Sequence, residues 1–195
     1  MLEPVTLTRK HVRLEPLSLD HAGGLIQVGL DPDLWRWIPF PVTTPEEMRA
    51  YVETALAEQK AGQSLPFAVI HQATGAVIGS TRYGNIDLAN KRVEIGWTWY
   101  AKAHQRSAVN TEAKLLLLTQ AFERLGMVRV ELKTDALNAA SRAAIARIGA
   151  TQEGIFRKHL ICQSGRVRDT VYFSILDSEW PEKKRALEEK LQEQP

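Results

Sequence analysis

The chain has 195 residues, enough for one domain with a sizeable core and few for two, so we expect a single domain over residues 1–195. Its 44% hydrophobic and 25% charged residues are typical of a globular protein and exclude disordered, collagen-like and low-complexity classes. The net charge of +2 is too small to require nucleic acid or an anionic membrane as a partner. Cys162, the single cysteine, excludes an internal disulfide and favours a reducing, cytoplasmic setting.

Apolar periodicity predicts both strands and helices in the first half of the chain. Thr44, Pro45 and the two following acidic residues form a strong helix start, with a cap, a first-position proline and an acidic first turn. The expected elements are a strand at 12–16, a helix over 18–30, a helix from 45 to about 62, and an antiparallel meander of strands at 66–71, 76–83 and 92–100.

The second half predicts a buried helix over 111–125, capped by Asn110 or Thr111 and ended by Gly126. A strand over 128–132 follows, and Asn138 caps the next helix, which runs to 147. Two long strands then turn at 164–165, and residues 178–195 form a charged helical tail. The expected class is mixed α/β.

The strand that ends at Tyr100, the loop after it and the start of the buried helix form the most informative stretch. A helix N-terminus directs unpaired N–H groups and the positive end of its dipole at one point, which suits a phosphate or pyrophosphate. The alternative is a capped core helix without a ligand.

Gln105, Ala108 and Asn110 occupy the positions of a loop motif, Q/R-x-x-G-x-G/A, that wraps a pyrophosphate. Downstream, Asn138 and Ser141 stand at the spacing of a second motif. In these motifs, and in their order along nearly the whole chain, the sequence resembles the GNAT acyltransferases, in particular the RimL/RimJ-like N-acetyltransferases. The resemblance implies a mostly antiparallel sheet splayed around a cofactor cleft and flanked by helices.

The same resemblance implies that acetyl-CoA is the cofactor, with no metal. Trp99 and Tyr100 are the candidates for backbone contact with the thioester oxygen. The cofactor-binding residues implied are Trp97, Thr98, Trp99, Tyr100, Gln105, Arg106, Ser107, Ala108, Val109, Asn110, Thr111, Asn138, Ser141 and Arg142.

The resemblance implies an acid at the position of Glu94 that takes a proton through water, and Glu94 is therefore the candidate general base, because a charged amine must lose a proton before it attacks a thioester. Strand alternation sets Glu94 opposite Val93, Ile95, Trp97 and Trp99. The alternative for Glu94 is a cross-strand ion pair with Arg82 or Arg92.

Ser141 is the candidate that stabilises the leaving thiolate from a helix first turn. Its alternative role is hydrogen bonding within that turn. Ile145 stands where many GNAT members carry a tyrosine acid.

Trp35 and Trp37, together with Glu94, are the candidate acceptor-binding residues, and the two indoles could instead fill a core. The implied reaction is transfer of an acetyl group to a primary amine, on a protein N-terminus or a small molecule, by direct attack in a ternary complex. A CoA-binding regulatory module without activity is the alternative. An RNA-binding domain is a third hypothesis, and its only support is the basic stretch 142–168. The sequence is compatible with a homodimer and does not decide the oligomeric state.

Overall fold

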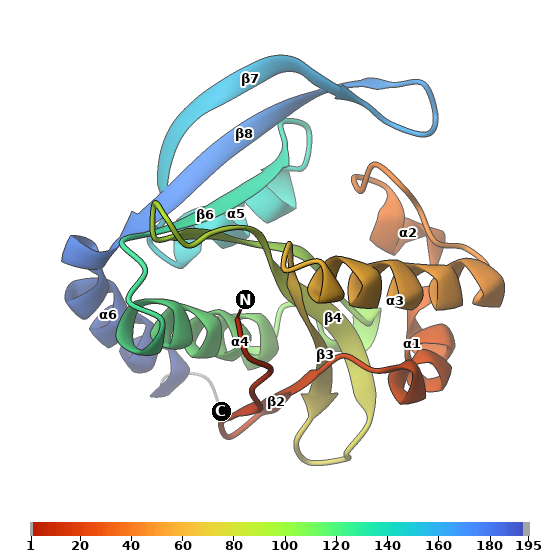
Figure 1. Ribbon diagram of the computed structural model, residues 1–195, viewed down its shortest axis with the longest axis horizontal. Coiled ribbons are helices and arrows are strands. Elements are labelled where there is room, and N and C mark those ends of the chain that lie inside the picture. The colour runs from red at the N-terminus through yellow and green to blue at the C-terminus, as the bar shows by residue number, and fades with distance from the viewer. Residues whose placement is uncertain (1, 193–195) are drawn as a thin grey trace.

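The computed structural model describes residues 2–192 as an eight-stranded sheet flanked by helices (Figure 1). The expected mixed α/β class and mostly antiparallel sheet are confirmed, since every neighbouring pair is antiparallel except β5 and β6. The spatial order is β1-β2-β3-β4-β5-β6-β8-β7. The strands are β1 (Leu7–Thr8), β2 (Val12–Pro16), β3 (Leu65–His71), β4 (Val77–Asp87), β5 (Arg92–Tyr100), β6 (Arg129–Asp135), β7 (Thr151–Ile161) and β8 (Val167–Leu176).

Six α-helices lie within residues 2–192, joined by short helical turns. The helices are α1 (Ala22–Gly29), α2 (Pro32–Trp35), α3 (Pro45–Lys60), α4 (Ala108–Thr119), α5 (Ala139–Arg147) and α6 (Trp180–Gln192). The turns are 3-10 at Leu19–His21, Lys102–His104 and Asp177–Glu179, and π-helical at Gln120–Arg124. None of these helices is long and apolar enough to span a membrane.

Helices cover the two faces of the sheet unevenly. On β3, Val69 faces the core that includes α4, whereas Ala68 and Ile70 face a second core built with α1 and α3. On β6, Leu132 faces the α4 core, but Lys133 on the opposite face lines an open cavity. In Figure 1 the β7–β8 hairpin arches away from the helices at the top of the molecule. The sheet face formed by β5, β6, β8 and β7 on the side of α3 is therefore partly open.

Most predicted elements are present, with shifted ends. The strand predicted to end at Tyr83 continues to Asp87, and the helix predicted over 18–30 is a 3-10 turn followed by α1. The C-terminal tail is helical from Trp180 to Gln192, and its predicted last residues, 193–195, lie outside the described residues. The short elements β1 and α2 were not predicted.

The predicted start of the buried helix is wrong. Helix α4 begins at Ala108 rather than after Asn110 or Thr111, because the Ser107 side chain accepts a hydrogen bond from the amide of Val109 (3.3 Å). Serine in an extended conformation is a preferred N-cap, so Ser107 caps the helix in place of Asn110 or Thr111. The α-helix also ends at Thr119, and a π-helical turn then leads toward the predicted stop at Gly126.

The predicted faces of β5 are also partly wrong. Val93 and Ile95 face the α4 core as expected, opposite Glu94, but Trp99 lies in the second core with α1 and α3. A bulge is the reason, because β5 has two residues, Trp97 and the one after it, where β4 has one. The extra residue reverses the alternation, so that Trp97 and Trp99 do not share the face of Val93 and Ile95.

Candidate active site

Strands β5 and β6 part in the middle of the sheet. Their parallel pairing covers Arg92 to Glu94 on β5 and ends at the pair of Glu94 with Glu131. Beyond that pair β5 continues to Tyr100, and its edge toward β6 has no strand partner within residues 2–192. Backbone N–H and C=O groups along an unpaired edge need partners. The parted strands thus offer a ligand a row of backbone hydrogen bonds.

The bulge lies directly after the point where the strands part. Trp97 has a φ of 50°, which is unusual for a bulky residue. Its indole is 38% exposed and lies against Gly84, where an added Cβ would come within 2.2 Å of the ring. The guanidinium of Arg82 lies over the same ring, 5.2 Å from its centroid. Strained backbone of this kind clusters at ligand sites.

Two helix N-termini follow the parted strands. Apart from the capped Val109 amide, the first-turn amides of α4 have no intrahelical acceptor. Asn138 caps α5 as predicted, its Oδ1 accepting from the amide of Ser141 (3.0 Å). Arg147 on α5 donates to Thr111 on α4 (2.8 Å), so these two helices are fixed together. Each of the two helix N-termini favours a negatively charged ligand.

The loop before α4 forms its turn without glycine at positions 108 and 110. The left-handed conformation falls on Arg106, at a φ of 57°, whereas Ala108 and Asn110 lie in the right-handed first turn. The Gln105 side chain donates to the carbonyl of Tyr100 (3.1 Å) and closes the loop onto the end of β5. Positions 108 and 110 therefore need no glycine for backbone conformation.

A buried lysine that the sequence analysis missed contacts the bulge. Lys114 on α4 is 6% exposed, and its Nζ donates to Thr98 Oγ1 (2.9 Å). The Thr98 hydroxyl also lies 2.7 Å from that of Thr81 on β4. Burial lowers the pKa of Lys114 to about 7. Its position directly before the apolar run 115–118 was the available signal, because a lysine there must find polar partners in the core.

Glu94 is buried at the point where the strands part, 3% exposed. Its Oε2 accepts from Asn85 Nδ2 (2.6 Å) and lies 2.8 Å from Lys133 Nζ. The ion pair with Arg82 or Arg92, the alternative considered for Glu94, is absent from residues 2–192, because other carboxylates hold both guanidiniums. The partner is on β6, and single-strand periodicity could not identify that strand as the parallel neighbour of β5.

The remaining predicted side chains lie in different environments. Ser141 is half-buried in the first turn of α5, where its amide is held by Asn138. Trp35 is 2% exposed, donates to the carbonyl of Gly29 and packs on Trp99 with 5.4 Å between ring centroids, so it fills a core. Trp37 is half-buried near the surface.

A buried ionic cluster lies at the C-terminal end of β6. Asp135, 1% exposed, pairs with Arg166, and Arg168 lies 3.9 Å away. The Arg166 guanidinium also lies over the Trp37 ring, 5.6 Å from its centroid. The loop between β7 and β8 thereby meets the segment after α2.

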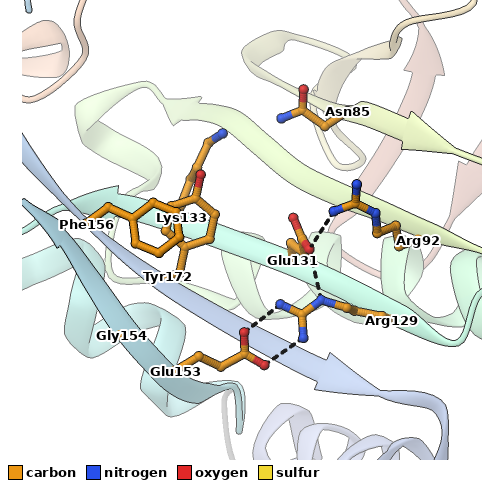
Figure 2. Close-up of a pocket in the computed structure, with 9 residues that line it drawn as sticks. All are labelled: Asn85, Arg92, Arg129, Glu131, Lys133, Glu153, Gly154, Phe156 and Tyr172. Carbon is orange, nitrogen blue, oxygen red and sulfur yellow. Dashed lines mark hydrogen bonds and ion pairs between the residues drawn. The ribbon is translucent and has the colours of Figure 1, made fainter. Parts of the chain in front are cut away.

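An open cavity of about 450 Å³ adjoins Glu94 on the partly open sheet face. Figure 2 shows its wall of ion pairs on one side and two stacked aromatic rings on the other. Asn85 and Lys133, the two partners of Glu94, both line it. The complete lining is Asn85, Arg92, Arg129, Glu131, Lys133, Glu153, Gly154, Phe156 and Tyr172.

Two helix N-termini follow the parted strands and a buried carboxylate lies where these strands part, an arrangement that suits a ligand with phosphate groups. Residues 11–151 match the family model of the acetyltransferase (GNAT) domain. The chain belongs to this family, whose fold implies the use of acetyl-CoA, and it is an acetyl-CoA-dependent acetyltransferase.

Relatives and solved structures agree with this membership. YdaF of Bacillus subtilis, which carries the name of a ribosomal N-acetyltransferase, is 30% identical over 171 residues, covering 86% of this chain and 90% of that protein. A GCN5-related N-acetyltransferase from Brucella melitensis has a TM-score of 0.91 and 35% identity, covering 97% of this chain and 86% of that one. Mycobacterium smegmatis RimJ in complex with CoA-disulfide is similar in fold, with a TM-score of 0.84, 23% identity and coverage of 96% and 95%.

Proposed function

We propose that the protein transfers an acetyl group from acetyl-CoA to a primary amine by direct attack in a ternary complex. The observation that carries the proposal is the buried Glu94 carboxylate at the apex of the parted strands, adjoining a cavity on the open sheet face. The cofactor reaches this apex from the side of the helix N-termini and the acceptor from the side of the cavity. The two substrates then meet at Glu94.

On the cofactor side, acetyl-CoA supplies the thioester that the amine attacks. Arg106 and Arg142, with the first-turn amides of α4 and α5, hold the phosphates, since both helix ends favour negative charge. The backbone N–H of Tyr100 donates to the thioester oxygen as charge develops there, because it points to the unpaired edge, whereas the N–H groups of Trp99 and Ala101 point toward β4. Ser141 stabilises the leaving thiolate from the first turn of α5.

On the acceptor side, the amine loses a proton as its nitrogen bonds to the acetyl carbon and the carbon–sulfur bond breaks. Glu94 takes that proton through water, because the carboxylate is buried and already holds Asn85 and Lys133. Trp37 borders the acceptor, whereas Trp35 supports the wall from the core. The name of YdaF supports a protein N-terminal α-amine as the acceptor.

The test is an acetyl-CoA assay with a panel of primary amines and N-terminal peptides, read as free CoA thiol and as acetylated product. We expect thiol release that depends on an amine. A CoA-binding regulatory module would instead gain only thermal stability from CoA, about 2.7 kcal/mol at a hundred times the dissociation constant, and release no thiol with any amine. That second result would contradict the proposed function.

A further inference from the structure

Two stacked rings lead from the surface to Glu94. The rings of Phe156 on β7 and Tyr172 on β8 are stacked with centroids 4.3 Å apart and an interplanar angle of 27° (Figure 2). Lys133 Nζ lies 5.6 Å from the centroid of Tyr172 and 2.8 Å from the carboxylate of Glu94. Since paired residues of antiparallel strands share a face, Lys133 and Tyr172 lie on the same side of the sheet. The rings therefore border the route by which an acceptor approaches Glu94.

The charges that line this cavity are already paired with one another. Arg129 makes two hydrogen bonds to Glu153, both 2.6 Å, and a third to Glu131 (2.9 Å). Arg92 lies 3.4 Å from Glu131 as well. The hydrogen bonds from Arg129 first, and then the one from the hydroxyl of Ser174 (2.6 Å), lower the pKa of Glu153 to about 2. A charged ligand would have to break these ion pairs, whereas an apolar ligand can cover the exposed ring faces without breaking any polar interaction.

Phe156 is 51% exposed, although a large apolar side chain gains from burial. Beside it, Gly154 pairs with Tyr172 across β7 and β8, and a Cβ added at Gly154 would meet no atom within 4 Å. The space above Gly154 and the two rings is therefore open. The cavity volume of about 450 Å³ lies in the range of small-ligand sites.

We propose that Phe156 and Tyr172 form a subsite that binds an apolar or aromatic group carried next to the acceptor amine. This inference rests on the proposed function, because the amine must then lie at Glu94. It adds a preference among amines: acceptors with a large apolar neighbour react faster than acceptors without one. Stacking on the exposed ring of Phe156 is the source of this preference. The charged side chains around it do not contribute, because they are already paired with one another.

The test compares kcat/KM, calculated for the free-base form of the amine, for two amino-acid amides, phenylalaninamide and glycinamide. We expect the wild type to favour phenylalaninamide about tenfold, the usual value of one aromatic contact. Phe156→Ala should reduce that ratio to near one. The matched control is Ile155→Ala, because Ile155 is 47% exposed on the neighbouring position of β7 but faces the other side of the sheet. It should keep the wild-type ratio.

Gly154→Val provides a second variant that fills the space instead of emptying it. Valine suits a strand, and no neighbour opposes its Cβ, so we expect a folded protein with the preference for phenylalaninamide lost. An unchanged ratio in both Phe156→Ala and Gly154→Val would overturn the subsite while the acetyltransferase activity stands. Equal values of kcat/KM for the two amides in the wild type would overturn the subsite, whereas only the absence of amine-dependent thiol release across the whole panel of amines and peptides would overturn the proposed function.

Discussion

Glu94→Gln is expected to lower the rate of acetyl transfer about 10²- to 10⁴-fold near pH 7, the usual contribution of a general base. The substitution keeps the size of the side chain and an oxygen that accepts from Asn85, so CoA binding should change little. At neutral pH an α-amine, with a pKa of about 8, is mostly protonated, and the variant cannot take up its proton. Raising the pH supplies free amine from solution and should partly restore the rate.

Glu131→Gln is the matched control for this experiment. Glu131 is the register partner of Glu94 on β6 and shares its face, but its carboxylate pairs with Arg92 and Arg129. It should lose little activity and show no recovery with pH. A Glu94→Gln protein with the wild-type rate at pH 7 would contradict the role of Glu94 as base.

Glu112→Ala is expected to cost about 3–5 kcal/mol of unfolding free energy, as removal of one partner from a buried charged group commonly does. Glu112 on α4 is 2% exposed, and its carboxylate accepts from the backbone amides of Lys10 (3.1 Å), His11 (2.6 Å) and Val12 (2.7 Å). Alanine leaves three amides unpaired at the start of β2. Urea unfolding with linear extrapolation measures the loss.

Glu46→Gln serves as the control for stability. Glu46 lies in the first turn of α3 with its side chain 80% exposed, and its ion pair with Arg49 spans 3.9 Å. Exposed pairs of this kind contribute about 0–1 kcal/mol, so the variant should unfold near the wild-type midpoint. Equal losses in the two variants would show that the Glu112 carboxylate does not hold β2 to α4.

Local signals in the sequence predicted most of the fold because they are strong where they occur. Thr44 and Glu47 form the expected start of α3, with the hydroxyl of Thr44 accepting from the amide of Glu47 (3.2 Å). Asn138 likewise caps α5 as predicted. The bulge at Trp97 could not be predicted, because an extra residue in one strand is defined by its pairing with β4 and leaves no mark in hydrophobic alternation.

The candidate site was predicted less completely, for a reason of sequence distance. Glu94 and the helix starts were identifiable from local patterns, but the partner of Glu94 is Lys133, which is brought close by the one parallel pairing of the sheet. Asp135 and Arg166 are likewise 31 positions apart and meet only through the β7–β8 hairpin. Contacts between distant segments require the topology, which periodicity does not supply.

The central claim is that the acetyl group passes directly from acetyl-CoA to an amine held with it in one complex. Initial rates measured while both substrates are varied test this most directly, together with the mass of the protein after incubation with acetyl-CoA alone. Direct transfer in a ternary complex gives intersecting double-reciprocal lines and a protein that gains no acetyl group. Parallel lines with an acetylated protein, for instance at Cys162, would mean a covalent intermediate and would contradict the account.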